Sequence, residues 1–234
     1  MGSVFPTLVV LVLLLAGGCA SQISEMPTWV GFDEDNVEGA DDVAVVVLEV
    51  APPAQVMLAA GEIGPKGWRD KGPKDGVWLS ARDGFVVAKV SPTQDETAYA
   101  VLQVRPHQLA RQKEGPAPTY GTGFWSAVPT HAGAGGARVP DQAEDRPAYG
   151  PTGGARVPVF EAIARRVTFV GTIRIDSLSE PEGDKAPQRV GITPVASAGD
   201  LEAVRGFLVQ HYPKIRARVV PRPLQMLRWN RVAK

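Results

Sequence analysis

The sequence predicts a mainly β protein: an antiparallel β-sandwich with one short C-terminal helix and a long Gly/Pro-rich insertion. Residues 43–50 form a run rich in β-branched side chains, which is typical of a strand buried on both faces. Asp83-Gly84 stands between two further apolar runs, a strong signal for a tight hairpin turn. The 234 residues include 25 Gly and 21 Pro, so many turns are expected, and the apolar fraction of 44% suffices for a packed core.

The predicted strands follow one another along a body that spans residues 43–212. They are residues 43–50, 56–63, 77–81, 85–90, 99–104, 167–176 and 189–195. Prolines end two of them, Pro52-Pro53 after the first and Pro106 after the fifth. The strands on either side of Asp83-Gly84 are expected to form a hairpin.

The strand over residues 167–176 alternates in polarity. Val167, Phe169, Gly171, Ile173 and Ile175 occupy one set of alternate positions, and Thr168, Thr172, Arg174 and Asp176 occupy the other. Because successive side chains of a strand point to opposite faces, this pattern predicts one buried face and one solvated face.

One helix is predicted near the C-terminus. Residues 197–200 supply capping side chains, and Pro213 ends the segment. Leu201, Val204, Phe207 and Leu208 form an apolar stripe at helical spacing, which we expect to pack on the sheet.

The insertion covers residues 106–158 and holds 9 Gly and 8 Pro, a composition typical of irregular chain. The hexapeptide Gly-Gly-Ala-Arg-Val-Pro occurs twice in it, at 135–140 and 153–158, which indicates a local duplication in a tolerant loop. Two equivalent partner-binding segments are the alternative. Tyr120, Phe124, Trp125 and Tyr149 suggest that parts of the insertion fold back onto the sheet.

The N-terminal segment has the features of an export signal. Residues 4–15 are almost wholly apolar, too short to cross a bilayer but of the length of a signal-peptide core. The small residues Ala16-Gly17-Gly18 follow, and Cys19, the only cysteine, comes directly after them. An ordinary cleaved signal peptide and an uncleaved membrane anchor are the alternatives to lipidation of this cysteine.

Residues 15–19, Leu-Ala-Gly-Gly-Cys, resemble the lipobox of bacterial lipoproteins. The resemblance implies that residues 1–18 are a lipoprotein signal peptide, cleaved between Gly18 and Cys19. Cys19 would then carry a diacylglycerol and often a further acyl chain such as palmitate, which together anchor a protein stably. Ala20 is not the Asp that favours inner-membrane retention, so the analogy favours the outer membrane, with the body facing the periplasm.

Charge is distributed unevenly in a chain whose formal net charge is zero. Residues 19–42 contain seven acids and no base, and are expected to form a solvated tether. The segment from Arg205 to the C-terminus contains eight bases and no acid, and residues 213–234 are expected to form a basic tail. This tail, which carries Trp229, could bind an anionic envelope partner or fold back against the tether. Zero net charge and export argue against nucleic-acid binding.

No catalytic arrangement is evident in the sequence. The three histidines, His107, His131 and His211, stand in none of the motifs of zinc proteases, and serine hydrolase and penicillin-binding motifs are also missing. Asp33-x-Asp35 lacks the later ligands and the glycine of a calcium loop. Accordingly no catalytic residue, metal or cofactor is predicted.

Taken together, the chain resembles uncharacterised bacterial lipoproteins with a small β-sandwich. The resemblance rests on the Cys19 region, Val104-Arg105-Pro106, residues 160–176 and the helix that ends in Tyr212-Pro213. It implies a lipid-anchored envelope protein that acts as a non-enzymatic binding or scaffolding module. The alternative is an envelope hydrolase acting on peptidoglycan or glycan, which would need paired carboxylates in a groove.

Overall fold

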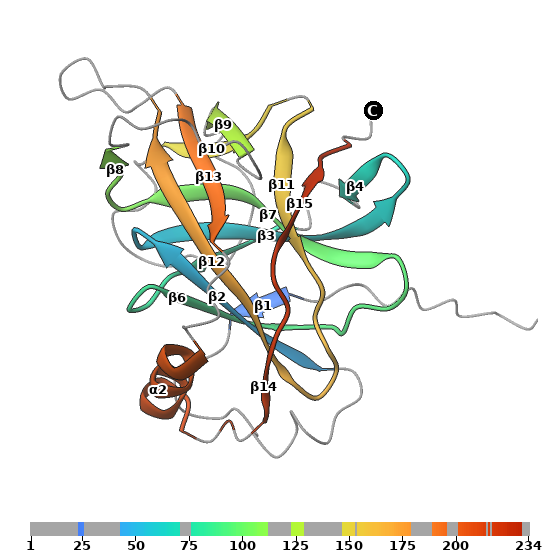
Figure 1. The fold of residues 1–234 in the computed structure, drawn as a ribbon, viewed down its shortest axis with the longest axis vertical. Coiled ribbons are helices and arrows are strands. Elements are labelled where there is room, and N and C mark those ends of the chain that lie inside the picture. The colour runs from blue at the N-terminus through green and yellow to red at the C-terminus, as the bar shows by residue number, and fades with distance from the viewer. Residues whose placement is uncertain are drawn as a thin grey trace, which may run out of the picture.

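Hydrogen bonds join the strands of the described part of the chain into one 15-stranded mixed sheet (Figure 1). The computed structural model describes residues 23–25, 43–70, 76–111, 123–128, 147–152, 154–178, 189–195, 201–213, 215 and 217–230. The strands are β1 (Ile23–Glu25), β2 (Ala44–Ala51), β3 (Ala54–Gly64), β4 (Gly67–Asp70), β5 (Val77–Ser80), β6 (Phe85–Val90), β7 (Thr97–Pro106), β8 (Ala110–Arg111), β9 (Gly123–Val128), β10 (Ala148–Pro151), β11 (Arg156–Phe160), β12 (Val167–Ser177), β13 (Arg189–Val195), β14 (Val219–Pro221) and β15 (Gln225–Arg228). The helix in this part of the chain is α2 (Leu201–His211).

The sheet curls around one main hydrophobic core. Its order is β1-β6-β2-β12-β13-β9-β10-β7-β11-β15, and β3 pairs with the opposite edge of β7. The prediction of a mainly β fold with one short helix is confirmed. A sandwich of two separate sheets is not confirmed, because the strands are connected in one sheet. That sheet is also mixed, since β12 runs parallel to β2, β8 and β14.

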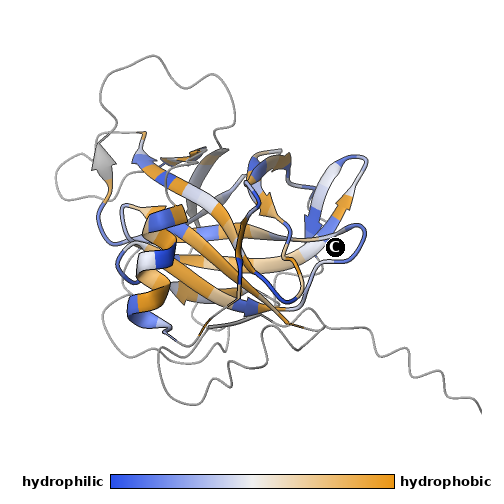
Figure 2. Ribbon diagram, turned by 60° about the horizontal axis from the view of Figure 1, so that its bottom comes forward, coloured by the Kyte–Doolittle hydropathy of each residue, from blue (hydrophilic) through white to orange (hydrophobic). Residues whose placement is uncertain are grey.

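The second strand separates two hydrophobic clusters. Ala44, Val46, Leu48 and Val50 of β2 face the main core, whereas Val45 and Val47 face a smaller cluster beneath α2. This burial on both faces was expected from the uninterrupted apolar run and is confirmed. Figure 2 shows the apolar colour concentrated along the central strands that α2 covers.

The helix α2 packs on the sheet through its apolar stripe. Val204, Phe207 and Leu208 are buried, as predicted, and the rings of Phe207 and Phe85 lie 4.7 Å apart between centroids. At the end of the helix, Nε2 of His211 lies 2.8 Å from Oδ2 of Asp83. The predicted capping residues 197–200 lie outside the described part of the chain.

Asp83 and Gly84 form the predicted tight turn, with φ values of +49° and +86°. Backbone hydrogen bonds run in both directions between Arg82 and Phe85, as in a two-residue hairpin loop. The expected hairpin ladder, however, ends at this one residue pair. Beyond the turn β5 pairs with β3 while β6 pairs with β2, so the turn carries the chain from one part of the curled sheet to another.

Strand β12 departs from the predicted alternation at Gly171. This residue has a φ of +98°, and the pairing with β2 shifts register between Phe169 and Thr172. The bulge exchanges the two faces, so Val167 and Phe169 lie beneath α2 whereas Ile173 and Ile175 lie in the main core. The prediction that these four side chains share one face was therefore wrong, as was that of a solvated face at Thr168, which is fully buried.

Parts of the Gly/Pro-rich insertion belong to the sheet, as its aromatic residues suggested. Trp125 on β9 and Tyr149 on β10 are buried almost completely, and the Trp125 indole donates a hydrogen bond to the Arg156 carbonyl at 3.2 Å. Burial raises the pKa of the Tyr149 hydroxyl above its usual value. The second copy of the hexapeptide leads into β11, where Val157 is buried; the first lies outside the described residues.

The C-terminal segment is not a free tail. Strand β14 pairs with β12, and β15 pairs with β11. Between them Arg222 and Leu224 donate backbone hydrogen bonds to the carbonyls of Phe169 and Val170, at 2.8 and 3.0 Å. The sequence analysis left open that this segment folds back, and its described part does so, but onto the sheet. Its backbone supplies the hydrogen-bonding partners, whereas Arg218, Arg222 and Arg228 stay exposed.

Part of the predicted tether also pairs with the sheet. Within residues 19–42, Ile23–Glu25 form β1 and lie antiparallel to Lys89 and its neighbours on β6. The tether prediction is therefore wrong for these three residues, whose backbone continues the sheet. The other residues of 19–42 lie outside the described part of the chain.

Candidate functional site

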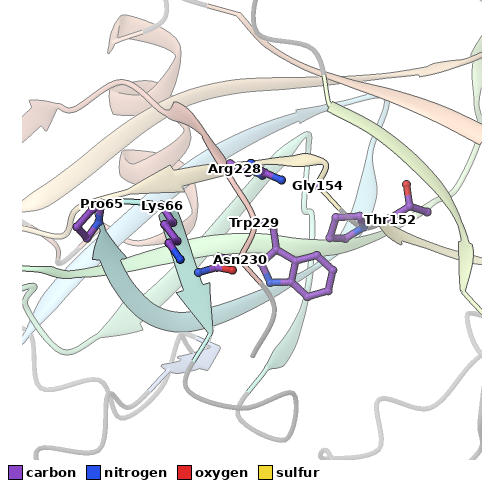
Figure 3. A pocket seen from close by; sticks show the side chains of 8 residues that line it. Pro65, Lys66, Thr152, Gly154, Arg228, Trp229 and Asn230 are labelled. Carbon is purple, nitrogen blue, oxygen red and sulfur yellow. The ribbon is translucent and has the colours of Figure 1, made fainter. Parts of the chain in front are cut away.

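A groove of about 870 Å³ opens where the β3–β4 turn, the β10–β11 turn and the end of β15 meet (Figure 3). It is lined by Pro65, Lys66, Pro151, Thr152, Gly154, Arg228, Trp229 and Asn230. The volume lies in the range of small-molecule binding sites. These residues come from three distant stretches of sequence, so the groove exists only in the folded chain.

The β3–β4 turn lies against β15 because of a glycine. Gly67 has a φ of +116°, a conformation that side-chain-bearing residues rarely adopt. A Cβ placed on Gly67 would lie 2.2 Å from the backbone oxygen of Arg228. Only a residue without a side chain therefore allows this close approach between the two walls of the groove.

Backbone hydrogen bonds fix the remaining wall. Trp229 forms an isolated β-bridge with Trp68, and the backbone N–H of Asn230 donates a hydrogen bond to the Trp68 carbonyl at 2.8 Å. The Trp229 amide donates to the carbonyl of Ala155 at 2.9 Å. Trp68 itself is fully buried and donates its indole N–H to the Ala98 carbonyl at 3.3 Å. The end of β15 is thus held to both turns, on a rigid base.

The charge of the groove is positive. Lys66 and Arg228 supply two cations, and none of its lining residues is acidic. The carboxylate of Glu62, further along β3, forms an ion pair with Arg69 at 2.8 Å. Asn230 and Thr152 add an amide and a hydroxyl. Such a set of groups can bind an anion by charge-assisted hydrogen bonds and hold polar groups beside it.

The structure brings only part of the predicted functional residues to the groove. Trp229 and Arg228 of the basic segment line it, whereas exposed Arg218 and Arg222 do not. Gly18 and Cys19, the predicted cleavage and lipidation residues, lie outside the described part of the chain, as does His131.

Sequence reasoning missed Lys66, Thr152 and Gly154. The Gly-Pro-Lys-Gly stretch at 64–67 signals a turn, but nothing local to it indicates that the end of β15 lies beside it. Thr152 and Gly154 fall in the insertion, which the sequence predicts to be a tolerant loop.

Two further polar groupings lie away from the groove. Gln55, which is 8% exposed, donates from Nε2 to the Ser80 hydroxyl at 3.2 Å, and the Arg105 guanidinium lies 4.3 Å above the Trp78 ring. Neither grouping adjoins the groove. Among the described residues, no cluster of three or more His, Cys, Asp or Glu side chains could hold a metal ion.

The described part of the chain contains no helix with the length and hydropathy required to span a membrane. Comparison of the sequence with protein-family models and curated proteins, and of the structure with solved structures, finds no match.

Proposed function

We propose that the protein is a lipid-anchored component of the bacterial cell envelope that acts as a non-enzymatic binding module. Lipidated Cys19 would attach it to a membrane, the outer membrane by preference, with the body in the periplasm. The groove between Lys66 and Arg228 would be its ligand site. The observation that carries the binding role is the lining of this groove, which combines two cations with polar groups and contains no carboxylate.

The same lining favours one of the two functions that the sequence left open. A glycan hydrolase of the usual kind needs two carboxylates facing its substrate across a groove. The residues of this groove offer an anion two cationic donors instead. The groove therefore supports binding of an anionic ligand rather than acid–base hydrolysis.

Exposed cations bind small anions weakly. A charge-assisted hydrogen bond contributes about 1.5–3 kcal/mol, and much of it is offset by the entropy of binding. A simple anion that contacts both cations is expected to bind with a dissociation constant on the order of millimolar, equivalent to about 4 kcal/mol.

Titration with inorganic phosphate tests the groove directly. We expect NMR signals of Gly154, Trp229 and Asn230 to shift in a saturable manner. The double variant Lys66→Gln/Arg228→Gln should lose at least about tenfold in affinity, because both charge-assisted contacts are removed.

The matched control is Arg205→Gln, which removes an exposed arginine from α2, outside the groove lining. It should bind phosphate as the unaltered protein does. Equal affinities for all three proteins, or shifts spread over arginines elsewhere, would refute the groove as the binding site.

A further inference from the structure

The groove contains an aromatic ring among its charged groups. Trp229 is half-buried and lines the groove with part of its indole. Figure 3 shows this ring between Lys66 and Asn230 on one side and Thr152 on the other, with Arg228 above. A ligand that enters the groove therefore meets an aromatic surface and polar groups together.

An indole surface suits the apolar side of a sugar ring. The face of an aromatic ring carries partial negative charge and attracts C–H groups that carry partial positive charge. A pyranose presents such C–H groups on one side and hydroxyls around its rim. Asn230 and Thr152 line the same groove, and their side-chain amide and hydroxyl are of the kind that exchange hydrogen bonds with sugar hydroxyls.

The two cations select among sugars. A neutral sugar would leave Lys66 and Arg228 without a counterpart in the ligand, whereas a sugar acid brings a carboxylate to them. The apolar part of the lining comprises only Pro65, Pro151 and Trp229, which is too little to bury an acyl chain. The volume of about 870 Å³ accommodates one or two sugar units.

The walls of the groove are already in place for such a ligand. Gly67 brings the β3–β4 turn against the Arg228 carbonyl, and Trp229 and Asn230 are fixed by hydrogen bonds to Ala155 and Trp68. Binding would cost little conformational entropy, because the Trp229 ring and the backbone beside it are held in place by the fold.

We propose that the groove binds an acidic sugar, with the sugar ring on the Trp229 indole and its acid group at Lys66 and Arg228. This inference rests on the proposed binding function and adds to it the class of ligand. The acid group of the ligand is a carboxylate or a phosphate ester, and both present the same negatively charged oxygens to the two cations.

Titrations with glucuronic acid, glucose and inorganic phosphate test the proposal. Glucuronate is expected to bind at least about tenfold more tightly than either glucose, which lacks the charge, or phosphate, which lacks the ring. Lys66→Gln/Arg228→Gln should reduce the affinity for glucuronate to that for glucose. Trp229→Leu should reduce it to that for phosphate, and thermal melting would check that this variant folds.

The possible results separate the two proposals. Equal affinities for phosphate and glucuronate, both lost in Lys66→Gln/Arg228→Gln, would overturn the sugar assignment and leave the anion-binding groove intact. If a short peptide with a free C-terminal carboxylate binds more tightly than glucuronate, the sugar assignment is wrong and the ligand is a peptide. Failure of all these probes to shift groove signals would overturn both proposals. If Trp229→Leu does not fold, the contrast between glucuronate, glucose and phosphate still decides the question.

Discussion

Replacement of Gly67 by alanine is expected to destabilise the protein by about 3 kcal/mol or more and to abolish binding at the groove. At a φ of +116° an alanine is strained, and its Cβ would lie 2.2 Å from the Arg228 backbone oxygen. Because that oxygen belongs to the backbone, the clash can be relieved only if β15 and the β3–β4 turn move apart. Urea denaturation of Gly67→Ala beside the unaltered protein measures the loss.

A glycine-to-alanine substitution at a position where the added Cβ meets no other atom provides the control. Gly206 lies on the exposed side of α2, with no atom within 4 Å of a Cβ placed there. Gly206→Ala is expected to stabilise the protein by about 1 kcal/mol, the difference in helix propensity between the two residues. A Gly67→Ala variant as stable as the unaltered protein would show that β15 does not lie against the turn.

Replacement of Trp125 by alanine is expected to cost about 3–5 kcal/mol, the usual loss for a large aromatic side chain in a core. The indole is fully buried, and its N–H donates to the Arg156 carbonyl on β11. The substitution would leave a large cavity in the main core and an unpaired carbonyl. Thermal or urea unfolding, monitored by circular dichroism, would measure the loss of stability.

The preceding residue offers a matched comparison. Phe124 is 47% exposed, so Phe124→Ala should cost less than about 1 kcal/mol. The contrast between these neighbours tests whether the Gly/Pro-rich segment contributes to the core. If both variants lose the same small amount of stability, β9 is peripheral and the segment behaves as the loop that its composition suggests.

Local signals in the sequence predicted the elements that depend on local physics. The apolar run of β2, the stripe of α2 and the Asp83-Gly84 turn each lie within a few residues, and each was found in its expected place. The bulge at Gly171 overturned the predicted pattern for the second half of β12, because one inserted residue exchanges the faces of all residues that follow.

Pairing between distant segments could not be predicted in the same way. The basic C-terminal segment reads as a solvated tail, yet its backbone completes the sheet beside β11 and β12. The sequence analysis noted Trp229 because it stands in the basic segment, but nothing near Lys66 in the sequence indicated that the two residues meet. The two belong to one groove only because the Trp68–Trp229 bridge brings the ends of their strands together.

The most direct test of the lipid-anchored binding module is the intact mass and detergent-phase partitioning of the native protein beside Cys19→Ser. The unaltered protein is expected to lose residues 1–18, to gain the mass of its acyl chains and to enter the detergent phase, whereas Cys19→Ser should do none of these. If both proteins instead remain in the aqueous phase with the same cleaved N-terminus and no added mass, Cys19 is not lipidated and the anchor proposal is wrong.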